Sequence, residues 1–101
     1  MLTSKQRAYL RSLATEADTI VQIGKDGISD NLILQVKNAL HARELVKGKV
    51  LENSMLTAKE AIEVLATECR AEQVQVIGSK FVLYKRNETE PKIELPKKAK
   101  K

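Results

Sequence analysis

Residues 19–29, with the sequence TIVQIGKDGIS, determine the fold. The first five are rich in β-branched side chains, which predicts a short, mostly buried strand over Thr19–Ile23. Gly24 and Gly27 allow a tight turn after it, and Ser29 has a side chain that can cap a helix N-terminus. Apolar residues then recur at helical intervals to about residue 43. This stretch therefore predicts a strand that leads through a turn into a helix.

The segments on both sides of this stretch continue the alternation of helix and strand. Thr3 and Gln6 have the spacing of a capping box, ahead of a helical pattern over residues 4–17. After the second helix, residues 45–51 alternate two lysines with apolar residues and glycine. That alternation predicts a second strand with one solvated face, which carries both lysines.

The next part of the chain has the pattern of one helix and a hairpin. Thr57 and Glu60 again have capping-box spacing, at the start of a helix with an apolar stripe and an acidic outer face. Residues 74–77 and 80–85 are separated by glycine and serine, and a glycine in the first position suits a type II′ turn. The second run is apolar on both faces, so we expect that strand to lie inside the sheet.

The order α-β-α-β-α-β-β predicts a single α/β domain. A helix joins the first two strands, which favours a right-handed parallel crossover, and the final hairpin adds two antiparallel strands. We therefore expect a four-stranded mixed sheet packed with helices. Residues 1–86 are assigned to this domain because the hydrophobic pattern fades beyond them. Residues 87–101 hold five lysines and three glutamates, which is typical of a disordered basic tail.

Charge limits the possible partners. The 101 residues include 18 Lys and Arg against 13 Asp and Glu, a formal charge of +5, of which +3 belongs to residues 1–86. A basic protein of this size favours an anionic partner, either nucleic acid or an anionic lipid surface. No basic amphipathic segment with exposed bulky apolar anchors is left for a membrane. Nucleic acid is therefore the stronger expectation.

The composition also excludes several classes of enzyme. One His and one Cys leave no ligand set for a Cys and His zinc site and no internal disulfide. We therefore expect a reducing, cytoplasmic location and no metal or cofactor. The chain has no apolar run of signal-peptide or membrane-helix length. Neither a P-loop nor the glycine motif of a dinucleotide fold is present, so we expect no small-molecule substrate.

The GxxG sequence of residues 24–27 is the sharpest candidate site. Two glycines let another molecule approach the backbone closely, and the following helix offers free N–H groups and a positive dipole to a phosphate. Lys25 adds a mobile positive charge. KH modules clamp a nucleic-acid backbone with such a loop, although there it joins two helices. The alternative is an ordinary strand-to-helix turn, and a lone GxxG does not decide between the two.

Basic side chains that could surround this loop form a second candidate feature. They fit a scattered solvated surface, but the acidic third helix segregates the opposite charge and favours a one-sided binding face. Arg7 and Arg11, one helical turn apart, extend the positive surface if their helix packs beside the loop. The candidate contact residues are Gly24, Lys25, Asp26, Gly27, Lys5, Arg7, Arg11, Lys37, Arg43, Lys47 and Lys49.

Residues that could serve catalysis are interpreted as structural. His41 has no Ser, Cys or carboxylate partner that spacing identifies, and a His near a helix C-terminus interacts favourably with the dipole. Cys69 lies on an apolar stripe, which favours a buried core thiol. Phe81 and Tyr84 face opposite sides of one strand, so at most one could stack on a base, and we expect Phe81 to pack in the core. We predict no catalytic residue and expect no enzyme.

The sequence resembles the CRM domain (chloroplast RNA splicing and ribosome maturation), in particular the stand-alone bacterial YhbY-like proteins. The resemblance spans about residues 2–86. Two positions depart from the family pattern, Arg43 where His is usual and Lys85 where Arg is usual, and both departures keep a basic residue. The matching stretches are LTSKQR at 2–7, VQIGKDG at 21–27, ELVK at 44–47, IGSK at 77–80 and LY at 83–84.

This resemblance implies a fold similar to the C-terminal domain of translation initiation factor three. It also implies RNA binding through the GxxG loop and nearby basic surface, association with ribosomal RNA in precursor large (50S) ribosomal subunits, and no catalysis. Asp26 fits less well, because a carboxylate repels phosphate unless it points away. We therefore expect a monomeric RNA-binding protein that acts in ribosome assembly. The alternative is a module that docks a basic ribosomal protein or assembly factor through the acidic third helix.

Overall fold

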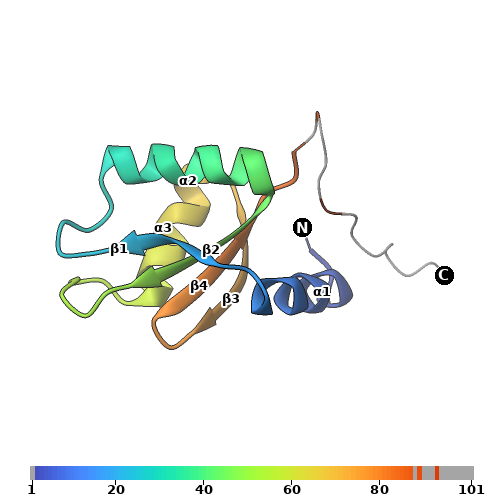
Figure 1. Ribbon diagram of the computed structural model, residues 1–101, viewed down its shortest axis with the longest axis horizontal. Coiled ribbons are helices and arrows are strands. Elements are labelled where there is room, and N and C mark those ends of the chain that lie inside the picture. The colour runs from blue at the N-terminus through green and yellow to red at the C-terminus, as the bar shows by residue number, and fades with distance from the viewer. Residues whose placement is uncertain (1, 88, 90–92, 94–101) are drawn as a thin grey trace.

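Helices and strands alternate along the chain. The computed structural model describes residues 2–87, 89 and 93. The predicted order of elements is confirmed, although the first helix ends two residues early and the third strand begins two residues early, because polar Glu72 and Gln73 also pair with β4. The elements in Figure 1 are α1 (Ser4–Thr15), β1 (Thr19–Ile23), α2 (Asp30–Arg43), β2 (Leu45–Val50), α3 (Ala58–Cys69), β3 (Glu72–Ile77) and β4 (Lys80–Tyr84).

Local capping signals mark the start of each helix. The Thr3 hydroxyl accepts a hydrogen bond from the N–H of Gln6, and the Gln6 side chain accepts one from the N–H of Thr3. The same reciprocal pair joins Thr57 and Glu60 at the start of α3. Ser29 caps α2, as predicted, by accepting from an N–H in the first turn. These three caps depend on residues close in sequence, which is why the pattern reveals them.

The four strands form one mixed sheet with the order β1-β2-β4-β3. β1 and β2 run parallel and are connected through α2, whereas β4 pairs antiparallel with both β2 and β3. The predicted interior position of β4 is therefore confirmed. At the β3–β4 turn, Gly78 has a φ of 58° and Ser79 has no positive φ, which fits the predicted type II′ turn.

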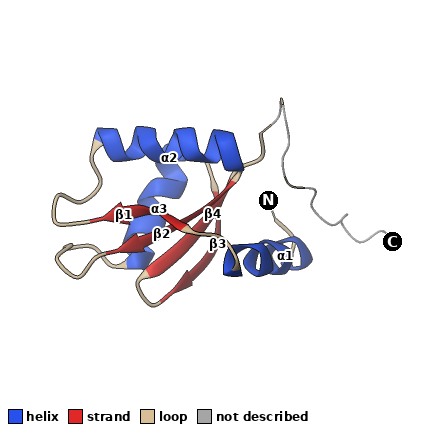
Figure 2. Ribbon diagram, in the orientation of Figure 1, coloured by secondary structure: helices blue, strands red, loops and turns tan. Residues whose placement is uncertain are grey.

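The helices cover the two faces of the sheet unequally (Figure 2). α2 and α3 lie on one face, over a core that includes Val46, Leu65 and Phe81. α1 alone packs on the other face, against β2, β3 and β4, over a smaller core that includes Leu10 and Tyr84. On this face of the sheet, α1 does not cover the part that lies toward the β3–β4 turn and the end of β1 (Figure 2).

Gly48 in β2 is required by packing in the larger core. A Cβ on this residue would fall on the ring of Phe81, its partner in β4. The missing side chain therefore lets the phenylalanine lie across the neighbouring backbone. Phe81 is only 1% exposed, so its predicted role in the core is confirmed. Tyr84 is buried in the opposite core, so neither ring is available to stack on a base.

Three residues of the segment assigned to a tail are described, at positions 87, 89 and 93. Asn87 is buried, and its N–H donates to Oε2 of Glu44 at 2.6 Å. The N–H of Ile93 donates to Oε1 of the same carboxylate at 2.6 Å, and the Ile93 side chain packs on the smaller core. These residues therefore contact the domain. The predicted disorder of the other tail residues lies outside the described part of the chain.

Candidate nucleic-acid interface

The GxxG turn, Gly24–Gly27, is a hydrogen-bonded β-turn at the end of β1. The N–H of Gly27 donates to the carbonyl of Gly24 at 3.0 Å. Lys25 and Asp26 occupy the two central positions, and both side chains are exposed. The turn therefore presents one positive and one negative side chain at its tip. Its conformation fits the ordinary strand-to-helix turn, with both glycines half-buried.

The two glycines of this turn are there for different reasons. Gly27 has a φ of 69°, a conformation that favours glycine over other residues. Gly24 has no positive φ, and a Cβ there would make ordinary contacts with Asn53 at 3.7 Å and Leu51 at 3.8 Å. The fold therefore favours glycine at position 27 and would accept a methyl group at position 24. Close approach of a ligand gives a separate reason for glycine at position 24.

The N-terminus of α2 is only partly available to an anion. Ser29 Oγ accepts from the N–H of Leu32 at 3.1 Å, which removes one of the free donors. Asp30 lies in the first turn, so its carboxylate already interacts with the positive end of the helix dipole. Asp26 adds a second nearby negative charge. A phosphate at the GxxG turn therefore depends more on Lys25 and the turn backbone than on this helix end.

A row of side chains crosses the whole sheet beside the turn. Strand pairing joins Gln22 of β1 to Lys49 of β2, Lys49 to Lys80 of β4, and Lys80 to Ile77 of β3. Directly paired residues point to the same face of a sheet. Gln22 is two residues before Gly24, so the row begins next to the turn. We call these four residues, Gln22, Lys49, Lys80 and Ile77, the cross-strand row.

The cross-strand row lies on the part of the α1 face that α1 leaves open. Lys47 is two residues from Lys49 on the same strand face, and its ammonium donates to the carbonyl of Ala14 in α1 at 3.1 Å. A shallow pocket of about 260 Å³ opens between the end of α1 and the ends of β3 and β4, with Ile77 and Lys80 in its lining. Ile77 is 63% exposed. The row is therefore accessible to a large ligand.

Lys47 has a structural role that its sequence position does not reveal. Its side chain is half-buried, and the bond to the Ala14 carbonyl attaches the end of α1 to the sheet. The face of β2 predicted to be solvated is therefore partly covered by a helix. The charge of Lys47 still adds to the positive potential of the open face, because a neutral carbonyl does not cancel it.

The other predicted contact residues lie elsewhere. Arg7 donates through Nε to the carbonyl of Gln73 in β3, at 3.3 Å. Lys5 and Arg11 are exposed on α1, and Lys37 and Arg43 are exposed on α2, which covers the opposite face of the sheet. The structure thus brings Lys47 and Lys49 onto one face of β2, and it places Lys25 on the turn that follows the neighbouring strand β1. It does not bring the complete predicted set onto a single patch.

Sequence reasoning missed Lys80 as a contact residue. Its place beside Lys49 follows from the antiparallel pairing of β2 with β4. A pairing between strands 30 residues apart leaves no local pattern. The hairpin turn at Gly78 fixes the register of Lys80 with Ile77, which was the one usable signal.

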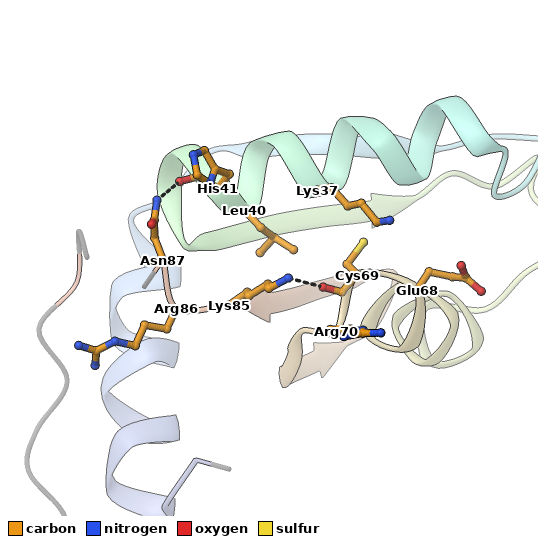
Figure 3. Close-up of a pocket in the computed structure, with 9 residues that line it drawn as sticks. All are labelled: Lys37, Leu40, His41, Glu68, Cys69, Arg70, Lys85, Arg86 and Asn87. Carbon is orange, nitrogen blue, oxygen red and sulfur yellow. Dashed lines mark hydrogen bonds between the residues drawn. The ribbon is translucent and has the colours of Figure 1, made fainter. Parts of the chain in front are cut away.

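His41 and Cys69 both line a second pocket, at the far end of α2 (Figure 3). Cys69 is buried, as predicted, and its Sγ lies 4.0 Å from the carbonyl oxygen of Ile33. Burial raises the pKa of this thiol, while the charges of Lys37 and Lys85 lower it by less. A thiol held neutral is a poor nucleophile. Over residues 2–87, 89 and 93, no group of three or more His, Cys, Asp or Glu could hold a metal ion.

These features define a class of protein, a small α/β domain with a GxxG turn beside an uncovered basic part of its sheet. The chain belongs to the CRS1/YhbY (CRM) domain family, whose model matches residues 2–85. The suggested family resemblance is therefore confirmed. No helix in the described part of the chain is long and apolar enough to cross a membrane.

Relatives of similar length support this assignment. The chain is 45% identical to "Probable RNA-binding protein YqeI" of Bacillus subtilis, over 95% of this chain and 100% of the relative. It is 37% identical to "RNA-binding protein" of Haemophilus influenzae, over 96% and 97% of the two chains. The solution structure of the hypothetical protein SAV1595 from Staphylococcus aureus is similar, with a TM-score of 0.78 and 50% identity over 95% of this chain and all of that one. The names of the Bacillus subtilis and Haemophilus influenzae relatives both describe RNA binding, and neither describes an enzyme.

Proposed function

We propose that this protein binds ribosomal RNA in precursor large ribosomal subunits and acts in their assembly, in the cytoplasm, as a monomer and without catalysis. The observation that carries the proposal is the cross-strand row beside the GxxG turn. Strand pairing sets Lys49 beside Lys80 on the open part of the sheet, and the row begins two residues before the turn that carries the exposed Lys25. The names of the bacterial relatives and the family match support RNA as the partner.

The proposed contacts divide the work between backbone and side chains. RNA approaches the turn closely at Gly24, where a hydrogen atom stands in place of a side chain. Lys25, Lys49 and Lys80 neutralise phosphates and position the RNA, with Lys47 adding to the local potential. Asp26 points into solvent and contacts no phosphate. Lys5, Arg7, Arg11, Lys37 and Arg43 lie outside this region and extend the positive field around it.

Selectivity in this proposal comes from the shape of the RNA. Phe81 and Tyr84 are both buried, so base stacking on them does not contribute. Lysine contacts to phosphate carry no sequence information. A folded RNA element that fits both the turn and the open face of the sheet is therefore the expected ligand.

Crosslinking in living cells, followed by sequencing of the attached RNA, tests this function. We expect crosslinks concentrated in ribosomal RNA of the large subunit, and sedimentation of the protein with large-subunit precursors. Crosslinks spread over unrelated RNAs, with no protein in the precursor fractions, would contradict the ribosomal assignment. The same experiment identifies the RNA fragment to use in binding measurements.

A protein-docking role through the acidic face of α3 is the competing function. Glu60 and Glu63 are exposed there, although Glu60 is also engaged in the capping box. Salt distinguishes the two functions. Contacts to a few phosphates predict a fall in RNA affinity of about 10- to 100-fold between about 50 and 200 mM salt. A docking module would show no appreciable affinity for protein-free RNA.

A further inference from the structure

A basic pocket lies at the end of α2 farther from the GxxG turn, between the C-terminal ends of α2 and α3 and the residues that follow β4 (Figure 3). Its volume is about 280 Å³. Four cationic side chains line it, Lys37, Arg70, Lys85 and Arg86, against one carboxylate, that of Glu68. This excess of positive charge in a concave site favours an anionic ligand. The proposed RNA contacts on the turn and the sheet do not involve these residues.

The helix C-termini beside this pocket would normally repel an anion. Here both ends are occupied by donors. The carbonyl of His41 accepts from Nδ2 of Asn87 at 2.8 Å, and the carbonyl of Cys69 accepts from the ammonium of Lys85 at 3.2 Å. The second bond places a full positive charge at the end of α3. The two helix ends therefore do not cancel the positive charge of the pocket.

Three of the four cations have no hydrogen-bond or ion-pair partner among the described residues. The side chains of Lys37, Arg70 and Arg86 are exposed and form no hydrogen bond or ion pair with any described residue. In Figure 3 the Lys37 ammonium extends over Cys69, whereas the Lys85 ammonium points toward the Cys69 carbonyl. The charges of Lys37, Arg70 and Arg86 are therefore available to a ligand without breaking a hydrogen bond or ion pair to a described residue.

Backbone strain is concentrated around the same pocket. In the described part of the chain, Glu44 and Arg70 are the two non-glycine residues with positive φ, at 66° and 55°. Arg70 caps α3 in a position where glycine is common, yet here the cap is an arginine that also lines the pocket. The Glu44 carboxylate accepts a hydrogen bond at 2.6 Å from the N–H of Asn87, which lines the pocket. Strain of this kind, held by surrounding structure, is frequent at binding sites.

We propose that this pocket is a second phosphate-binding site, which receives a backbone phosphate of the bound RNA. The inference rests on the proposed RNA-binding function. The pocket lies on the α2 and α3 side of the sheet, whereas the cross-strand row lies on the α1 side. RNA that fills both sites therefore contacts the protein on two faces, and Lys37 and Arg70 supply the phosphate contacts of the second one.

Charge reversal with a matched control tests the pocket. Lys37→Glu and Arg70→Glu are compared with Lys59→Glu, an exposed lysine on α3 that lies outside the pocket lining. Affinity for the crosslinked ribosomal RNA fragment is measured by fluorescence anisotropy over a range of salt. We expect each pocket variant to weaken binding about threefold or more beyond the control and to reduce the salt slope by about one. Far-ultraviolet circular dichroism checks that each variant is folded. Lys37→Ala replaces Lys37→Glu if the charge-reversed variant does not fold.

The outcomes separate this site from the general function. Suppose that the wild-type protein binds the fragment and Lys49→Glu lowers the affinity, but both pocket variants have the same affinity as Lys59→Glu. The second site is then rejected and the proposed function stands. If the wild-type protein does not bind the fragment, both the second site and the proposed function are rejected.

Amide chemical shifts of residues 37–41 and 85–87 distinguish a phosphate of the RNA backbone from a phosphate of a free nucleotide as the ligand of the pocket. Shifts caused by RNA but not by 5′-AMP at equal phosphate concentration support an RNA backbone, and tighter binding of 5′-AMP overturns it.

Discussion

The carboxylate of Glu44 accepts a hydrogen bond from the backbone N–H of Asn87 at 2.6 Å and so joins the start of β2 to the segment that follows β4. The other oxygen of the same carboxylate accepts from the N–H of Ile93, also at 2.6 Å. Glu44 is fully buried. One side chain thus fixes the path of the chain beyond the last strand, including Asn87, which lines the basic pocket.

Removing this carboxylate should destabilise the domain. Glu44→Ala leaves two N–H groups without their charged acceptor, while the backbone strain at this position is unchanged because alanine has a Cβ too. We expect the free energy of unfolding in urea to fall by about 2 kcal/mol. Glu52→Ala, at an exposed loop position, is the control and should change it by less than about 0.5 kcal/mol. Equal effects of the two substitutions would show that Glu44 is not an anchor.

Gly24 and Gly27 should respond differently to alanine. Gly27→Ala forces a side chain into a positive φ and should cost about 1 kcal/mol of folding stability. Gly24→Ala meets only ordinary contacts, so its stability should stay within about 0.5 kcal/mol of wild type while RNA affinity falls several-fold. Urea unfolding and fluorescence anisotropy measure the two effects. Unchanged RNA affinity in Gly24→Ala would exclude close approach at the turn.

Gly48→Ala should strongly destabilise the larger core, because the added methyl group overlaps the ring of Phe81. We expect a loss of about 2 to 3 kcal/mol in the free energy of unfolding. Phe81→Leu alone should also destabilise, but the double substitution should lose less than the two single losses combined, since the smaller side chain makes room. Additive losses would indicate that the two residues do not share one space.

Cys69 should be unreactive in the folded protein. Burial raises the pKa of its thiol, so the folded chain keeps it neutral at a pH where the unfolded chain has begun to ionise. Stability should therefore decline as pH rises above about 8.5, and Cys69→Ala should lack that part of the decline. Reaction with a thiol reagent should be slow in the native protein and fast in concentrated guanidinium chloride. Similar rates in both states would contradict a buried thiol.

The sequence predicted the features that depend on near neighbours. Caps at Thr3, Ser29 and Thr57, and the hairpin turn at Gly78, each involve residues a few positions apart, so a single sequence contains the whole signal. The interior place of β4 followed from its apolar character on both faces. Helix and strand order, with these caps, was sufficient to predict the fold class.

The candidate site was only partly predictable, because its assembly depends on contacts between distant residues. Lys80 joins Lys49 through strand pairing, and Lys47 reaches the carbonyl of Ala14, 33 positions away. Glu44 is fully buried, and no pattern in the neighbouring sequence predicts that burial. The basic pocket combines residues from α2, α3 and the end of β4, which no spacing rule brings together.

The salt dependence of RNA binding by Lys49→Glu and Lys80→Glu tests the central claim most directly, that the cross-strand row binds RNA phosphates. Lys59→Glu changes the net charge equally and lies on α3, across the sheet, so it serves as the matched control. We predict that each row variant lowers affinity for the ribosomal RNA fragment roughly fivefold more than the control and reduces the slope of log affinity against log salt by about one. Row variants whose affinity and slope equal those of Lys59→Glu would contradict the claim.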